Sequence, residues 1–195
     1  MADEFDFGRF HELLYSASKS AFKNIQHLRQ DEHFYIFALY TCGDLAYVIP
    51  TSSTEEGLIV AAQKYSTIKR YQDFSIEQLR ERLRWSPCDS PLHTFGEEYF
   101  AEVNNFVAKV PLILDAIPIE ESWLEFNSFV EQFIGVCISV LKQLDQEGVF
   151  GEGEQRNSIV LNILMGDQSD EERIKYAKLL NPSSVYNRFA QVYHA

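Results

Sequence analysis

The ten residues LMGDQSDEER, from 164 to 173, place four acids within six positions directly after an apolar run. Carboxylates this close together could bind a metal ion, or they could mark the start of a helix. A calcium loop would need Asp-x-Asp-x-Asp-Gly spacing and a Glu at its twelfth position, and this pattern is missing. Ser169 and Glu172 instead have the spacing of a capping box, in which each side chain satisfies a free backbone N–H. We therefore predict a helix start at Ser169, with no metal and no cofactor.

Asp167, beside Gly166, is the acid that this helix start does not use. It follows an apolar segment with the character of a strand, and loops at strand ends often carry function. The simpler interpretation is an Asx-turn that opens the loop. Both interpretations place Asp167 at the exposed end of the strand.

A second stretch, RWSPCDSPLH, brings Trp85, Cys88, Asp89 and His93 within nine positions. A Cys-His nucleophile would require contact between the two side chains and a third group that orients them. A metal site would require further ligands, and the other histidines form no motif. We predict a surface loop anchored by Trp85, with a catalytic role as the less favoured alternative.

The glycines of FGEGE, residues 150–154, resemble a phosphate-binding loop only superficially. Such a loop leads into a helix N-terminus, whereas we expect a strand to follow here.

The charge of the chain is concentrated in one segment. The net charge is −12. Residues 115–154 contain nine acids and one lysine, and residues 64–84 have a net charge of +3. Lys and Arg form no dominant face of the kind that binds phosphates, which argues against nucleic-acid binding. The acidic segment could steer a basic protein partner or could simply be a solvated outer surface; the candidate binding residues are Glu120, Glu121, Glu125, Glu131 and Asp145, with Glu147, Glu152 and Glu154 as further steering charges.

The length and composition indicate one folded domain, residues 1–195. The chain is 46% hydrophobic and 14% aromatic, enough for a substantial core. The first residues are acidic, no signal-peptide pattern follows, and the apolar stretch FVAKVPLILDAIPI is interrupted by charges and prolines. We expect a cytoplasmic protein that does not bind membranes. The three cysteines suggest neither disulfides nor a zinc ribbon: Cys137 is expected in the core, and Cys42 and Cys88 are expected to be reduced thiols in loops.

The periodicity of apolar residues predicts an α+β fold, in which a small and mostly antiparallel sheet packs against several helices. One long amphipathic helix runs from residue 121 to about 147, with Gly148 as its C-terminal cap. Its apolar face is expected to begin at Trp123 and to continue to Leu144. Ser53, Ser75, Ser122 and Ser169 each begin a capping-box pattern. The expected helices are 7–28, 53–68, 75–83, 95–107, 121–147, 170–180 and 184–193. The expected strands are 34–41, 46–50 and 157–165, with a further short strand considered at 83–87. Strand 34–41 is apolar on both alternating faces, so we expect it to be covered on both sides and to form a hairpin with strand 46–50.

The order of these elements, with FYIFALYT, AYVIPTSSTEEGL, LRWSPCDSPLH, GVFGEGEQRNSIVLNILMGDQSDE and a late LNP, resembles the bacterial family described as domain of unknown function 4303. The resemblance covers nearly the whole chain and implies a single compact domain, with no catalytic residues to transfer. Ser90 departs from the aromatic residue that the resemblance leads us to expect after Asp89.

Two functions from different classes follow. The favoured one is a non-enzymatic interaction module that binds a basic protein, and by analogy with other small acidic bacterial proteins the partner could be a toxin neutralised by an immunity protein or antitoxin. The alternative is an enzyme or small-ligand binder with its site at the strand ends, where the candidate walls are Glu55, Glu56, Trp85, Asp89, His93 and Asp167.

Overall fold

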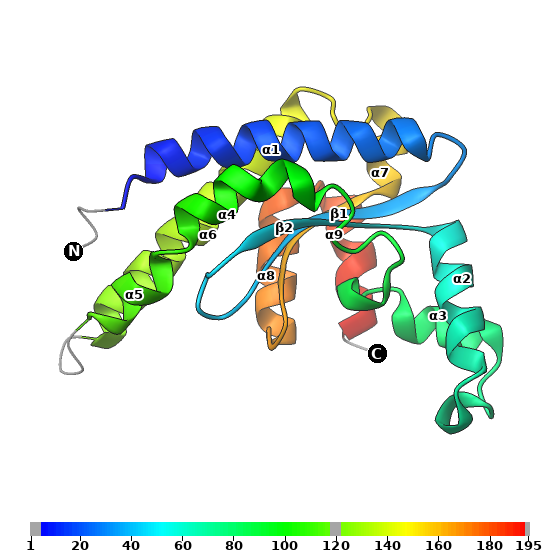
Figure 1. Cartoon of the computed structure of the whole chain (residues 1–195). Helices are drawn as coiled ribbons and strands as arrows, with labels where there is room; N and C mark the ends of the chain where they lie inside the picture. The colour runs from blue at the N-terminus through cyan, green and yellow to red at the C-terminus, as the bar shows by residue number, and fades with distance from the viewer. Residues whose placement is uncertain (1–4, 118–121, 194–195) are drawn as a thin grey trace.

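The computed structural model describes residues 5–117 and 122–193, which form a three-stranded sheet surrounded by helices (Figure 1). The strands are β1 (Phe34–Thr41), β2 (Val48–Thr54) and β3 (Val160–Met165), in the spatial order β2-β1-β3. β1 and β2 form the predicted antiparallel hairpin, and β3 runs parallel to β1. The predicted α+β class is confirmed, with a sheet that is mixed because of this one parallel pair.

The central strand β1 contributes side chains to two cores. Phe37 and Leu39 belong to the core on one face of the sheet, and Ala38 and Tyr40 belong to the core on the other face. Such alternation between two buried faces is what the continuous apolar sequence of β1 predicted. Helices must therefore cover both sides of the sheet.

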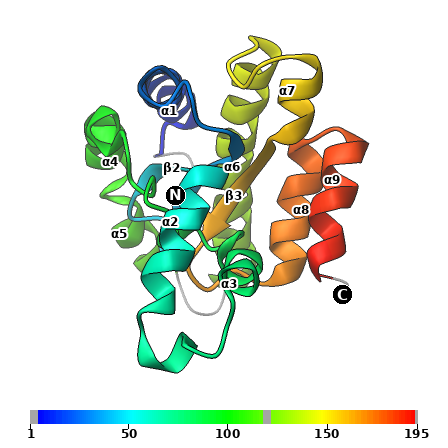
Figure 2. The ribbon, with the colours of Figure 1, turned by 90° about the vertical axis from the view of Figure 1, so that its right-hand side faces the viewer.

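The first core is built mainly against α1 (Phe7–Leu28), α4 (Ala101–Val107), α5 (Val110–Asp115) and α6 (Ser122–Gln146). The second core is built against α2 (Glu55–Ser66), α3 (Ile76–Leu83) and α9 (Ser183–Ala190). α8 (Asp170–Leu180) packs beside β3 and contributes to both cores. Figure 2 shows β3 between α1 on one side and α8 on the other. Short 3-10 helices complete the chain: η2 (Lys69–Tyr71), η3 (Pro87–Asp89), η4 (Glu97–Phe100) and η5 (Gln191–Tyr193).

Two of the four predicted capping boxes are formed at the start of a helix. The capping boxes at Ser75 and Ser169 are both formed. The one predicted at Ser53 is wrong, because Ser53 still belongs to β2 and the side chain of Thr54 accepts the hydrogen bond from Gly57 N. At the fourth position, Ser122 is the first residue of α6 and its side chain lies outside the described part of the chain.

The long helix α6 ends as predicted. Gly148 has a φ of +72°, which glycine adopts without strain, and Gly148 N and Val149 N donate to Asp145 O and Leu144 O. By length and composition Trp123–Gln146 could span a membrane. Its apolar face instead forms part of the core through Phe129, Phe133, Cys137, Val140, Leu141 and Leu144, so we interpret α6 as the core helix of the fold.

Three local predictions are wrong. The short strand considered at 83–87 is absent, because α3 continues to Leu83 and η3 begins at Pro87. The loop after Gly148 is not followed directly by a strand, since the six-residue helix α7 (Gly153–Ser158) precedes β3. The helix expected at 95–107 is split into η4 and α4.

Candidate functional site

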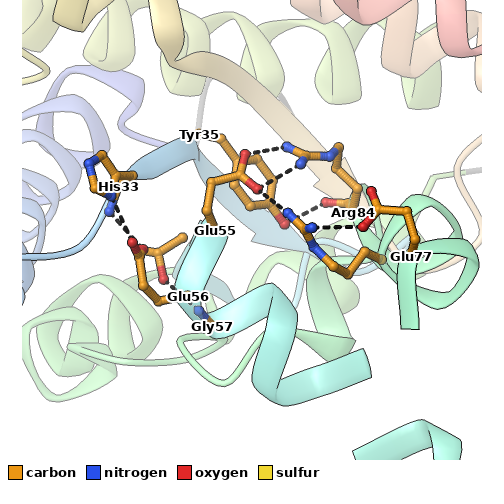
Figure 3. A network of polar contacts seen from close by, with 9 residues as sticks. His33, Tyr35, Glu55, Glu56, Gly57, Glu77 and Arg84 are labelled. Carbon is orange, nitrogen blue, oxygen red and sulfur yellow. Dashed lines mark hydrogen bonds and ion pairs between the residues drawn. The ribbon is translucent and has the colours of Figure 1, made fainter. Parts of the chain in front are cut away.

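Glu55, the first residue of α2, is held by two arginines, Arg80 in α3 and Arg84 at the C-cap of α3 (Figure 3). Arg84 donates to both carboxylate oxygens at 2.7 Å, and Arg80 donates to one of them at 3.2 Å. Partial burial raises the pKa of Glu55, but the hydrogen bonds and charge of Arg84, followed by those of Arg80, hold it below its ordinary value. Glu55 is therefore an ionised link between α2 and α3, and both of its oxygens are occupied.

Glu56 points away from this pair, toward His33 (Figure 3). Its carboxylate accepts from His33 N at 2.8 Å and lies 2.7 Å from His33 Nδ1. The hydrogen bonds from the His33 side chain and backbone lower the pKa of Glu56, and the hydrogen bond to Glu56 raises the pKa of His33. The two adjacent glutamates thus serve separate contacts.

Asp89 is also occupied within its own loop. Its carboxylate accepts hydrogen bonds from the hydroxyls of Tyr65 and Ser86. The contact with Tyr65 ties η3 to α2, and the contact with Ser86 lies within the loop itself. Asp89 is therefore a structural acceptor.

His93 lies against β2 and β1. Its Nδ1 is 3.2 Å from Thr51 Oγ1, and its ring meets the Tyr40 ring edge-on at 5.1 Å. Burial lowers the pKa of His93, and the charge of Glu97 opposes this shift. The structure records no hydrogen bond between His93 and Cys88, so the Cys-His arrangement considered from the sequence is not assembled.

The six predicted wall residues therefore do not form one site. Glu55, Glu56, Asp89 and His93 are engaged in four separate contacts, whereas Trp85 and Asp167 border two different clefts. Within residues 5–117 and 122–193, no group of three or more His, Cys, Asp or Glu side chains could hold a metal ion.

The cleft that contains Trp85 lies at the C-terminal ends of β1 and β3. It has a volume of about 300 Å³, and we call it the arginine cleft because Arg82 and Arg173 are among its walls. Its lining residues are Tyr40, Glu81, Arg82, Trp85, Ser86, Pro87, Cys88, Met165, Gly166, Arg173, Val192 and Tyr193. Ligands of open α/β sheets bind preferentially outside the carboxyl ends of strands, which makes this position notable.

Asp167 borders the neighbouring cleft, of about 350 Å³, which shares Tyr40, Met165 and Gly166 with the arginine cleft. Gly166 lies between them in close contact with Tyr40, because a Cβ at this position would be 3.1 Å from Tyr40 Oη. The predicted exposed position of Asp167 at the strand end is confirmed.

The predicted acidic surface is only partly available. Asp145 pairs with Arg156, a largely buried side chain that also donates to Ile159 O and Leu180 O. Lys19 and the hydroxyl of Tyr15 donate to Glu147. Both acids are thus used inside the fold.

The other predicted acids differ in position. Glu120 and Glu121 lie outside the described residues. Glu125 and Glu131, both on α6, are exposed and make no ion pair in the part of the chain that the structure covers, and Glu152 and Glu154 are exposed near α7.

The start of α6 also exposes two large apolar side chains. The sequence placed Trp123 on the apolar face of this helix and gave no position for Leu124. Trp123 is 74% exposed and Leu124 is 81% exposed. Leu112 of α5, at the same end of the molecule, is 72% exposed. Trp123 shares the helical spacing of the core residues, but the helix begins beyond the edge of the core.

Sequence reasoning missed Arg82, Arg173 and Tyr193 as neighbours of Trp85. They come from α3, α8 and η5, and no local pattern connects these segments. The sequence contains only one indirect signal for this cleft. Gly166, directly after an apolar strand, marks the strand end at which these segments meet.

Comparison with known proteins identifies the family of the chain. No curated protein and no solved structure matches the chain. The family model described as Domain of unknown function (DUF4303) matches residues 14–182, which is most of the chain. The protein therefore belongs to the DUF4303 family, as the order of its sequence motifs had suggested.

Proposed function

We propose that this protein is an interaction module that binds a basic protein partner through the start of α6. The surface consists of Leu112, Trp123, Leu124, Glu125 and Glu131, and we call it the Trp123 surface. The observation that carries the proposal is the exposure of Trp123 and Leu124 beside an acidic residue, Glu125.

Large apolar side chains at such exposures lose the gain in free energy that burial would provide, about 2 kcal/mol for a leucine. Tryptophan is also the residue type most often found to dominate binding energy at protein interfaces. The exposure of the neighbouring residues Trp123 and Leu124 therefore supports a role in association.

The acidic side chains near the start of α6 favour a partner of positive charge. Glu131 follows Leu124 by seven residues, so both lie on the same side of α6. Glu125 and Glu131 can steer a positively charged protein, and their effect falls as salt screens it. Asp145 and Glu147 are left out of the proposed surface because Arg156 and Lys19 occupy them. Neutralisation of a basic toxin by an immunity protein or antitoxin would be one instance of this function.

The proposal is tested by charge reversal. The double variant Glu125→Lys, Glu131→Lys should weaken binding of an identified, purified basic partner by about tenfold or more at low salt, and the difference should shrink at high salt. The control is Asp73→Lys, Glu98→Lys, which makes the same change in net charge at two exposed acids on other elements. The control should stay within about twofold of the wild type. Equal binding by wild type and reversal variant, with unchanged melting temperatures, would exclude these charges from the interface.

A further inference from the structure

The arginine cleft contains two arginines without a carboxylate partner. Elsewhere in the described chain, Arg9, Arg29, Arg80, Arg84 and Arg156 each pair with an acid. Arg70, Arg82, Arg173 and Arg188 make no such pair within the described residues, and two of these four, Arg82 and Arg173, line this cleft together with Glu81. In a protein of net charge −12, two guanidinium groups at one cleft that are not neutralised by a carboxylate pair form a local positive site.

Two residues that line this cleft each also carry a buried hydrogen-bond donor without an acceptor. Only four buried side-chain N or O atoms in the described residues have no hydrogen-bond partner, and two of them are Trp85 Nε1 and Arg173 Nε. An unsatisfied buried donor destabilises the fold, and in native proteins it calls for an explanation such as a ligand or ion. Both belong to residues that line the arginine cleft.

The remaining walls suit an organic ligand better than a bare ion. Tyr40, Trp85 and Tyr193 give the cleft aromatic sides, and Trp85 is fixed by edge-on contacts with Tyr35 and Phe189. A volume of about 300 Å³ is at the small end of the range for small-molecule sites.

We propose that the arginine cleft binds a small organic oxyanion, a carboxylate or phosphate ester that carries an aromatic or apolar group. The guanidinium of Arg173 would donate to the anionic oxygens, since a planar guanidinium fork matches carboxylates and phosphates. Arg82, whose guanidinium stacks over Phe74 at 4.2 Å, would add the second positive charge. The aromatic walls would hold the apolar part. This site is separate from the Trp123 surface and does not depend on it.

The indole N–H groups allow a direct test, because the chain has only two tryptophans. Trp85 lines the cleft, and Trp123 lies on the exposed start of α6. In an NMR titration with benzoate, phenyl phosphate or inorganic phosphate, the Trp85 indole signal should shift saturably and the Trp123 signal should stay fixed. A response to benzoate alone identifies a carboxylate site, a response to phenyl phosphate alone identifies a phosphate-ester site, and a response to both identifies a general oxyanion site. We expect inorganic phosphate to bind more weakly than phenyl phosphate because it leaves the aromatic walls empty.

Arg173→Gln should weaken this binding by about tenfold or more, which corresponds to the loss of one charge-assisted hydrogen bond. Arg188→Gln, at an exposed arginine of α9 that donates to Asn157 O and does not line the cleft, is the matched control and should bind as the wild type does. Arg82→Gln, at an exposed residue, provides a second variant should Arg173→Gln prove unstable. The proposal is overturned if no probe shifts Trp85 saturably up to about 10 mM. It is also overturned if folded Arg173→Gln and Arg82→Gln both bind as tightly as the wild type.

Discussion

The two oxygens of Glu56 bind the backbone and the side chain of His33, which makes this exposed contact sensitive to pH. The pKa of His33 lies above its ordinary value of 6.5, and the pKa of Glu56 lies below its ordinary value of 4.5. The contribution of His33 to stability is complete below pH 6.5 and is lost as pH rises through the raised pKa. The contribution of Glu56 is complete above pH 4.5 and is lost as pH falls through the lowered pKa. The contact between His33 and Glu56 should therefore stabilise the fold most between pH 4.5 and pH 6.5, the ordinary pKa values of the two groups.

Glu56→Gln should return the His33 pKa, measured by NMR titration, to about its ordinary value. The melting temperatures of variant and wild type should differ more at pH 5.5, below the ordinary pKa of His33, than at pH 8, because the contribution of His33 is lost as pH rises through its raised pKa. His93 is an internal control, because burial lowers its pKa and it does not contact Glu56. An unchanged His33 pKa in the variant would show that the contact does not form in solution.

At the scale of elements, the free edge of β3 is completed by side chains instead of a fourth strand. Asn181 accepts from Leu161 N at 2.8 Å and donates to Leu161 O at 2.7 Å. Gln168 accepts from Met165 N and donates to Ile163 O. An open strand edge is a template for aggregation, and these two amides occupy it along most of its length.

Asn181→Ala should destabilise the protein by about 2–4 kcal/mol, because it leaves a buried N–H and a buried C=O without partners. Chemical denaturation measures this change in the free energy of unfolding. Asn187→Ala removes an exposed amide of α9 and should cost less than about 0.5 kcal/mol. Similar losses in the two variants would mean that water can replace Asn181 at the strand edge.

Elements could be predicted from sequence where local signals define them. The helices Phe7–Leu28 and Asp170–Leu180 have the predicted bounds, since apolar periodicity and, at Ser169, a capping box are local properties. The parallel pairing of β3 with β1 could not be predicted, because it joins segments more than a hundred residues apart. The exposure of Trp123 was missed for a related reason: helical spacing tells which residues share a face, and only the tertiary structure tells where the core ends.

At the scale of the whole molecule, the two proposed sites are separate. The Trp123 surface is formed by residues of α5 and α6, whereas the arginine cleft lies at the C-terminal ends of β1 and β3. Figure 1 shows the positions of these helices and strands. The sequence predicted that acidic side chains contact a partner. In the structure, Asp145 and Glu147 instead form intramolecular ion pairs, whereas Glu125 and Glu131 are exposed on the helix that also exposes Trp123 and Leu124. A candidate pocket could not be assembled from sequence, because its walls come from segments distant in the chain.

The central claim, that the Trp123 surface binds a basic protein, is tested most directly by site-specific photo-crosslinking in the cells that make the protein. An aromatic photo-crosslinker placed at position 123 preserves the character of the tryptophan, and the same group at position 73 serves as the control on a distant exposed turn. The account predicts that a protein of net positive charge is crosslinked from position 123 and not from position 73, and that Glu125→Lys, Glu131→Lys reduces its yield. A position 123 that crosslinks no protein, or only proteins that position 73 crosslinks equally well, would contradict the account.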